Sequence, residues 1–407
     1  MGFDFPVEAI CEGTTNVIVP RLEAFKRGAW DYAPSRAPVF YNPLMKPCRD
    51  IAVLALQSYQ EIVGREIRVS EPLAGCGVRG IRFAREVRGV STVHLNDINA
   101  KACELARYNV RLNNLEGRVF ISNEDANLFL SRHAAPLQRF DFIDIDPFGS
   151  PVPYIDSAVR ALKDGGLLAL TSTDLATLCG VYPRVALRKY GGLSLKTEYS
   201  HEIAVRLVAG CLAMMAAKHD IGIKVIFSHS ASHCIRLYAL IEYGAKRADS
   251  SINNMGYLLH CPKCLHREPL QEILPMKCAL KCPECGSTLK AAGPLWLGKI
   301  IDKAFCLLME RNLGNFKYLD DGVARLIMFA KDEADAPITY YVIDKICERI
   351  SIPTPPIGEV IDIIGGMGFK AFRTHFHTRG IRTDAPASVV VKAVKEAAER
   401  RRQNSLT

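Results

Sequence analysis

The 407-residue chain contains no apolar run long enough to cross a bilayer. Its most apolar helical stretch, residues 203–217, falls short of the roughly 20 residues that a membrane helix needs, and it contains Arg206. The opening residues, MGFDFPVEAICEG, lack the basic start and apolar centre of a secretion signal. Internal repeats and low-complexity tracts are also absent. We therefore expect a soluble, cytoplasmic protein with no membrane partner and no obligate protein partner.

An excess of acidic residues is missing too. Lys and Arg number 52 against 43 Asp and Glu, which gives a net charge of +9 and favours a polyanionic partner. Apolar residues make up 49% of the chain, so a folded core is expected rather than disorder. The length exceeds what one compact core usually holds and predicts two or three domains. Without a secretion signal, the 14 cysteines are expected to be reduced core thiols, apart from one cluster.

That cluster consists of two C-x-x-C pairs, CPKC at 261–264 and CPEC at 282–285, spaced as in a zinc ribbon. Four thiolates fill a tetrahedral zinc site and leave no position for water, so the predicted metal is structural. The predicted ligands are Cys261, Cys264, Cys282 and Cys285. Cys278 is an alternative ligand, and His260 and His266 are also close in sequence. Four unligated thiols are the alternative to a metal site.

Residues 142–153, FIDIDPFGSPVP, carry two aspartates out of an apolar run into a Pro-Phe-Gly turn. At the turn, Asp146 supplies a carboxylate, the proline a rigid corner and Phe148 a ring for stacking. Such a group suits the binding of a flat, amine-bearing molecule, because the carboxylate can accept an N–H and take up the proton after the nitrogen attacks. A buried strand followed by an ordinary turn would use the same residue types.

Three acids follow three predicted strands. After the strand at 67–70, the glycines of GCGVRG spell G-x-G-x-x-G, which on its own also permits a nicotinamide dinucleotide fold. Asp97 follows the strand at 93–95 and could accept the hydroxyls of a ribose, while Asp125 follows the strand at 119–122 and could meet an adenine amine. Each acid alone could be a helix cap. Together with Asp146 they predict a doubly wound sheet whose ligands lie at the carboxyl ends of its strands.

The later strands, 167–171, 224–229 and 234–243, are ordered as in a methyltransferase sheet, which favours S-adenosylmethionine over a dinucleotide. With these motifs in place, the chain resembles the tRNA guanine-26 N2-dimethyltransferases of archaeal and eukaryotic type. The matching stretches are EGTTNVIVP, VFYNPLMKPCRDI, GCGVRGIRFAREV, LNDIN, EDAN, DIDPFGSP, TSTDLATLCGVYPRVALRKYG, GPLWLG and THFHTRGIRTDAP.

The resemblance implies roles for single residues. Arg49 and Arg79 would contact the methionine portion of S-adenosylmethionine, Asp97 its ribose, and Asp125 with the Ala126 backbone its adenine. Asp146 would be the catalytic carboxylate, and Phe40 and Phe148 would sandwich the target guanine. Cys48 departs from the family, which usually has Asn there. The alternatives are a surface Arg49 paired with Asp50, an Arg79 packed along a helix, and a core Phe40.

The predicted fold is therefore an α/β class I S-adenosylmethionine-dependent methyltransferase with a Rossmann-like doubly wound sheet, a zinc-ribbon insert and a C-terminal α+β RNA-binding domain. The expected domains are 1–245, an N-terminal segment with the methyltransferase domain, 246–293, the zinc-ribbon insert, and 294–407, a winged-helix-like tRNA-binding domain. In the last of these, Arg373, His375, His377, Arg379 and Arg382 surround two phenylalanines, a combination that suits RNA.

The expected reaction is direct transfer of methyl groups, twice, from S-adenosylmethionine to N2 of guanine 26 of tRNA, after the base has left its stack. The nearest alternative is methylation of another exocyclic amine, such as adenine N6 in DNA or RNA, or of a protein amide. A non-catalytic RNA-binding protein on a methyltransferase scaffold is the other.

Overall fold

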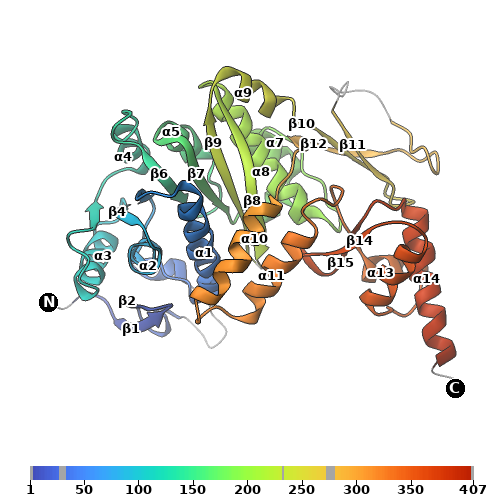
Figure 1. Ribbon diagram of the computed structural model, residues 1–407, viewed down its shortest axis with the longest axis horizontal. Helices are drawn as coiled ribbons and strands as arrows, with labels where there is room; N and C mark the ends of the chain where they lie inside the picture. The colour runs from blue at the N-terminus through green and yellow to red at the C-terminus, as the bar shows by residue number, and fades with distance from the viewer. Residues whose placement is uncertain (1–2, 27–33, 232, 272–279, 405–407) are drawn as a thin grey trace. The chain divides into compact units, whose positions relative to one another are not determined.

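The computed structural model describes residues 3–26, 34–231, 233–271 and 280–404 (Figure 1). Cys278, the alternative zinc ligand, lies outside these residues. The chain forms two compact units. Unit 1 comprises Met1–Ser172, Tyr238–Tyr243 and Leu307–Ala324, and unit 2 comprises Thr173–Leu237, Gly244–Cys306 and Arg325–Thr407.

Unit 1 opens with an antiparallel hairpin of β1 (Val7–Glu12) and β2 (Thr15–Pro20). Three short 3-10 turns follow at Leu22–Phe25, Pro34–Arg36 and Pro43–Met45. Helix α1 (Lys46–Val63) has a proline in its first turn and ends at Gly64, whose left-handed conformation stops the helix. The hairpin packs its apolar face against α2 and α3, so it is anchored on the helices of unit 1.

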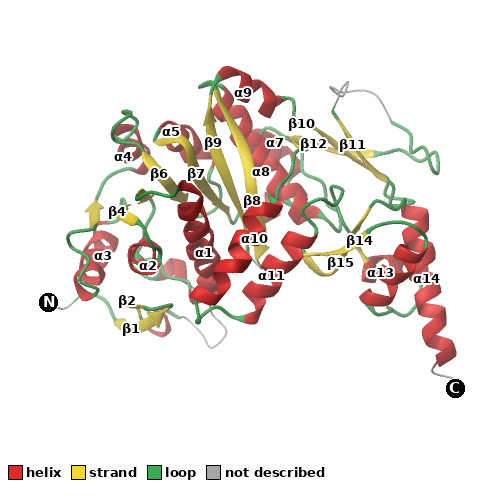
Figure 2. Cartoon of the chain, in the orientation of Figure 1, coloured by secondary structure: helices red, strands yellow, loops and turns green. Residues whose placement is uncertain are grey.

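Strands and helices then alternate (Figure 2). The order is β3 (Ile67–Glu71), α2 (Val78–Glu86), β4 (Val90–Asn96), α3 (Ala100–Leu112), β5 (Val119–Ser122), α4 (Ala126–Arg132), β6 (Phe140–Ile145), α5 (Val152–Arg160) and β7 (Leu162–Ser172). β6 is buried along its whole length, as expected for a strand covered on both sides.

With β8 (Ile221–Ala231) and β9 (Cys234–Tyr243), these strands form one sheet in the order β5-β4-β3-β6-β7-β9-β8. The neighbouring pairs from β5 to β7 are parallel. The predicted α/β fold with a central parallel sheet is thus confirmed. The strand order reverses between β3 and β6, and open parallel sheets bind ligands at the carboxyl edge beside such a point.

Unit 2 is built mainly from helices and two small sheets. Its helices are α6 (Leu175–Leu178), α7 (Pro183–Tyr190), α8 (Ser200–Ala217), α9 (Ala245–Ile252), α12 (Ile343–Ile350), α13 (Ile357–Gly366) and α14 (Ala387–Asn404). One sheet has the order β11-β10-β12, from β10 (Met255–His260), β11 (Arg267–Leu270) and β12 (Lys290–Trp296). The other has the order β13-β15-β14, from β13 (Tyr341–Val342), β14 (Ala371–Thr374) and β15 (His377–Thr383).

Two helices span a boundary of the units, α10 (Lys303–Asn312) and α11 (Asp321–Asp332), and between them a 3-10 turn at Leu313–Asn315 belongs to unit 1. In the described part of the chain, α8 is the one helix with the length and composition of a membrane span. Most of that helix is buried inside the fold, as in a core helix, so it is weak evidence for a span.

The prediction that five basic residues near the C-terminus together face RNA is wrong for two of them. Arg382 is only 3% exposed, and the His375 side chain is fully buried. Both donate to the carboxylate of Glu333. Burial raises the pKa of Glu333, but Arg382 and His375 outweigh this and lower it to about 2. Arg382 thus pairs with Glu333 inside unit 2, because a buried cation needs a partner charge, and His375 is held by the same carboxylate.

Candidate active site

The glycine loop after β3 is fixed by Asp97 at the end of β4. Asp97 Oδ2 accepts the backbone N–H of Gly75 at 2.8 Å, and Oδ1 accepts that of Asn99 at 2.9 Å. Gly77 caps α2 in a left-handed conformation with φ +77°. Two carboxylate oxygens offer about four acceptor positions, so two remain for the hydroxyls of a ribose. The geometry therefore fits the predicted role of Asp97, which stays a prediction.

Asp125 is the N-cap of α4, which is the alternative role expected for a single acid after a strand. Its Oδ1 accepts the backbone N–H groups of Asn127 and Leu128 at 2.9 and 3.1 Å. Both bonds end on Oδ1, so among the described residues Oδ2 stays available for an amine. Ala126 begins the helix, where backbone N–H groups have no partner within the helix. Capping and adenine binding are thus compatible at this strand end.

Asp146 follows β6 at the same carboxyl edge and lies beside Arg79 of α2. Arg79 Nη2 donates to Asp146 Oδ2, and its Nη1 lies 3.0 Å from Asp144 Oδ1. A third carboxyl, Glu71, has Oε1 3.9 Å from the same Nη1 and accepts the Gly80 N–H at 2.9 Å. Burial raises the pKa of Glu71 to about 8. Arg79 therefore does not simply pack along its helix, but lies within a group of three carboxyls.

Phe40 and Phe148 meet at this site. Their ring centroids are 4.7 Å apart and their planes are nearly perpendicular, at 87°. Phe148 is 68% exposed and Phe40 38%, so Phe40 is not a core residue. A base stacked between two rings needs roughly 7 Å between their centroids, because stacked atoms lie about 3.5 Å apart. The predicted sandwich therefore requires the rings to separate by about 2 Å and to turn parallel.

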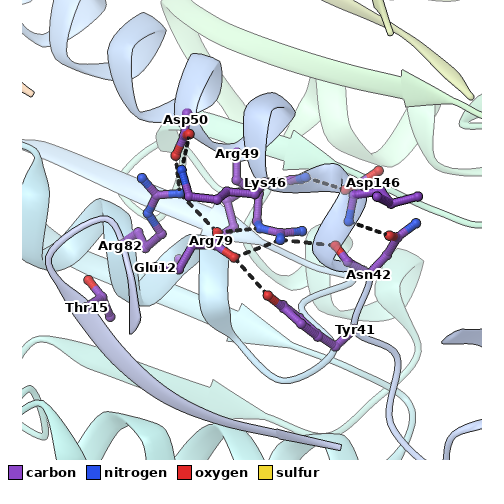
Figure 3. A network of polar contacts seen from close by, with 12 residues as sticks. Glu12, Thr15, Tyr41, Asn42, Lys46, Arg49, Asp50, Arg79, Arg82 and Asp146 are labelled. Atoms are coloured by element: carbon purple, nitrogen blue, oxygen red, sulfur yellow. Dashed lines mark hydrogen bonds and ion pairs between the residues drawn. The ribbon is translucent and has the colours of Figure 1, made fainter. Parts of the chain in front are cut away.

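Arg49 of α1 is buried and binds Glu12 at the end of β1 (Figure 3). The distances from Glu12 Oε1 and Oε2 to Arg49 Nε and Nη2 are 2.6 and 2.8 Å. Tyr41 donates its hydroxyl to Glu12 at 3.1 Å, and Arg82 Nη1 lies 3.0 Å from the same carboxylate. The alternative of a surface Arg49 paired with Asp50 is wrong, since Asp50 pairs with Arg82 instead, at 2.7 Å.

The same network continues to Glu86. Its carboxylate accepts from Arg82 Nε at 3.0 Å, from the Tyr318 hydroxyl at 2.6 Å and from the Thr15 hydroxyl at 2.9 Å. The hairpin, α1, α2 and the segment around Tyr318 are thus joined by buried charges within unit 1. Sequence reasoning assigned no role to Glu12 or Glu71, although Glu12 lies in EGTTNVIVP, which carries the family resemblance, and Glu71 closely precedes GCGVRG.

The four cysteines of the two C-x-x-C pairs come together in unit 2. Their sulfur atoms all lie within 4.8 Å of one another. Cys261 and Cys285 Sγ are 3.5 Å apart, and Cys264 and Cys282 Sγ are 3.4 Å apart. Bonds of about 2.3 Å to a tetrahedral zinc place sulfurs roughly 3.8 Å apart, so the set fits this metal. Neither His260 nor His266 belongs to the group.

The first cysteine knuckle contacts the C-terminal helices. Leu265 packs against the buried cluster of α12, α13 and α14. The Arg267 guanidinium lies 3.7 Å from the centroid of the Tyr341 ring, and Arg349 of α12 donates to the backbone oxygen of Pro262. The position of the knuckle and the packing of these helices are therefore linked.

Comparison with known proteins agrees with this geometry. Residues 13–395 match the family described as N2,N2-dimethylguanosine tRNA methyltransferase. The tRNA (guanine(26)-N(2))-dimethyltransferase of Methanothermobacter thermautotrophicus is 44% identical, over 92% of this chain and 95% of that protein. The tRNA (guanine(26)-N(2)/guanine(27)-N(2))-dimethyltransferase of Aquifex aeolicus is 35% identical, over 96% of each.

A solved structure is also similar along nearly the whole chain. Trm1 from Pyrococcus horikoshii, in complex with S-adenosyl-L-methionine, superposes with a TM-score of 0.81 at 33% identity, over 95% of this chain and 99% of that one. The predicted family is confirmed by these matches, and they do not favour another amine substrate or a non-catalytic scaffold. The chain belongs to the N2,N2-dimethylguanosine tRNA methyltransferase family.

Proposed function

We propose that this protein methylates the exocyclic N2 of guanine 26 in tRNA twice, with S-adenosylmethionine as methyl donor. The observation that carries the proposal is the position of Asp146 at the carboxyl end of β6, beside Phe148 and Phe40, on the sheet edge that also holds Asp97 and Asp125. The match to the family over residues 13–395 supports the same substrate.

S-adenosylmethionine would supply an electrophilic methyl group, which leaves sulfur as N2 of guanine attacks it. Asp97 would hold the ribose hydroxyls and Asp125 with the Ala126 N–H the adenine, while Arg49 would contact the methionine portion. The first role uses the two acceptor positions of Asp97 that the glycine loop leaves open.

Asp146 would accept the N–H of N2 and take the proton that the nitrogen loses as the C–N bond forms. An amine on an aromatic ring is a poor nucleophile, so its orientation toward the methyl group matters. Phe40 and Phe148 would supply that orientation by holding the plane of the base. After the first transfer, the remaining N–H must meet Asp146 again for the second.

The four clustered cysteines would hold a structural zinc ion. The closed set of four thiolates has no open position, so the metal would stabilise the knuckles without taking part in the reaction.

The test is methyl transfer from labelled donor to tRNA carrying guanine or adenine at position 26, followed by nucleoside analysis. The Asp146→Ala variant should lose activity by at least 100-fold, roughly the contribution of a positioned proton acceptor, and should keep its donor affinity by calorimetry. Asp156→Ala, at a half-exposed aspartate of α5 that pairs with Arg160, is the matched control. Unchanged turnover in Asp146→Ala would remove this residue from the mechanism, and equal labelling of both tRNAs would remove the substrate assignment.

A further inference from the structure

Asp144 is a second aspartate in the strand that ends at the site, and the proposed reaction does not use it. It is fully buried, two residues before Asp146. Side chains two residues apart along a strand lie on the same face, so both carboxylates point to the same side of the sheet. A buried carboxylate is costly without a partner charge, and a second one nearby adds repulsion. The arrangement therefore needs a cation that both can share.

Arg79 supplies that cation. It is 3% exposed, with Nη1 3.0 Å from Asp144 Oδ1 and Nη2 donating to Asp146 Oδ2. The planar fork of a guanidinium can bind two acceptors at once, which an ammonium group cannot do with the same geometry. Asp144 thus holds Nη1 of the guanidinium, and Nη2 holds the Asp146 carboxylate, whose side chain is 23% exposed.

Other charged groups also face Arg79. Glu71 of β3 lies 3.9 Å from it, and Arg49 of α1, which is paired with Glu12, repels its positive charge. Burial raises the pKa of Glu71 to about 8, so at neutral pH the two aspartates are the carboxylates that balance Arg79. Removing the charge of Asp144 alone therefore changes how strongly Arg79 attracts Asp146.

We propose that Asp144 is a positioning residue for methyl transfer: it holds Arg79 so that the guanidinium fixes the Asp146 carboxylate in place without suppressing its ability to accept the N2 proton. The proposal rests on the proposed role of Asp146. It assigns to Arg79 a contact with the proton acceptor in addition to the predicted contact with the methyl donor.

The test variant is Asp144→Asn, which keeps the shape of the side chain and removes its charge. With no second carboxylate to share it, Arg79 should attract Asp146 more strongly and make it a weaker base. We expect the single-turnover rate at saturating donor and tRNA to fall roughly tenfold, the effect of about one unit in acceptor basicity. The acidic limb of the rate against pH should move to lower pH, and donor affinity should stay within about twofold.

A purely structural role gives a different result. It would lower the melting temperature and the active fraction but leave the acidic limb where it is, and that result would overturn the proposal. An unchanged rate would overturn it as well. Asp156→Asn, the same change at a half-exposed aspartate, is the control.

Arg79→Lys is the second variant and serves if Asp144→Asn does not fold. It keeps the positive charge but cannot bridge both aspartates, so the rate should fall while the melting temperature stays near that of the wild type. A wild-type rate in Arg79→Lys would contradict the bridge. Equal labelling of tRNA with guanine and tRNA with adenine at position 26 would instead refute the proposed function, so the two failures are distinguishable.

Discussion

Neutralising Glu12 should destabilise unit 1 by about 3 kcal/mol. Burial raises the pKa of Glu12, but the hydrogen bonds and charges of Arg49 and Arg82 outweigh burial and lower it from 4.5 to about 2. At about 1.4 kcal/mol per unit, this shift corresponds to about 3 kcal/mol of stability at neutral pH. Leaving two buried arginines without one of their carboxylates gives a similar cost, about 3 to 5 kcal/mol.

The contribution of Glu12 to the stability of unit 1 should decrease as the pH falls. Because the pKa of Glu12 is lower in the folded state, its contribution is complete above the unfolded value of 4.5 and is lost as the pH falls toward about 2. The stability difference between wild type and Glu12→Gln should therefore be constant at neutral pH and shrink below about pH 4.5.

Urea denaturation followed by circular dichroism measures both effects. Glu8→Gln is a matched control, because Glu8 is an exposed glutamate of the same strand and its neutralisation should change stability by less than about 0.5 kcal/mol. If Glu12→Gln costs no more than Glu8→Gln, or if its cost is the same at pH 3 and pH 7, the buried network does not stabilise the unit as inferred.

Two further predictions concern a close contact at a glycine and the proposed zinc site. A Cβ at Gly80 would lie 2.3 Å from Leu95 Cδ2, so Gly80→Ala should lower stability by about 1 to 3 kcal/mol in thermal denaturation, whereas Gly117→Ala, with open space around it, should not. Removal of metal by a chelator, or Cys264→Ser, should expose the C-terminal helices to protease and weaken tRNA binding while donor affinity is kept, because the first knuckle packs against those helices. Cys11→Ser, at an exposed cysteine, is the control. An unchanged cleavage pattern with unchanged tRNA affinity would contradict this link.

Sequence patterns of a few residues were sufficient to predict the strands and the carboxyl edge of the sheet, on which the candidate site lies. The strand predicted at 119–122 has these bounds in the structure, and α2 follows the glycine turn as expected. Strand-forming residues, glycine turns and acids at strand ends all act over a few residues, so the sequence displays them directly.

Partners of charged side chains could not be predicted in this way. Arg49 lies next to Asp50 in sequence but binds Glu12, 37 positions away, and Arg79 binds Asp146, 67 positions away. Pairings over such distances depend on how strands and helices stack. The partner of Arg382 could not be predicted from its neighbours in sequence either, because Glu333, which neutralises it, is 49 positions away. A buried arginine and an RNA-binding arginine therefore look alike in the sequence.

The edge-on contact between Phe40 and Phe148 has a consequence for which molecules can enter. While the rings touch, each covers part of the other's apolar surface, and parting them gives up about 1 kcal/mol of aromatic contact. A planar base that presents a face to both rings recovers more than this, at about 1 to 3 kcal/mol for stacking. Water, free amines and aliphatic side chains recover nothing comparable. If the two rings bind the base as proposed, the pair would select for flat aromatic molecules before any hydrogen bond to the base is made.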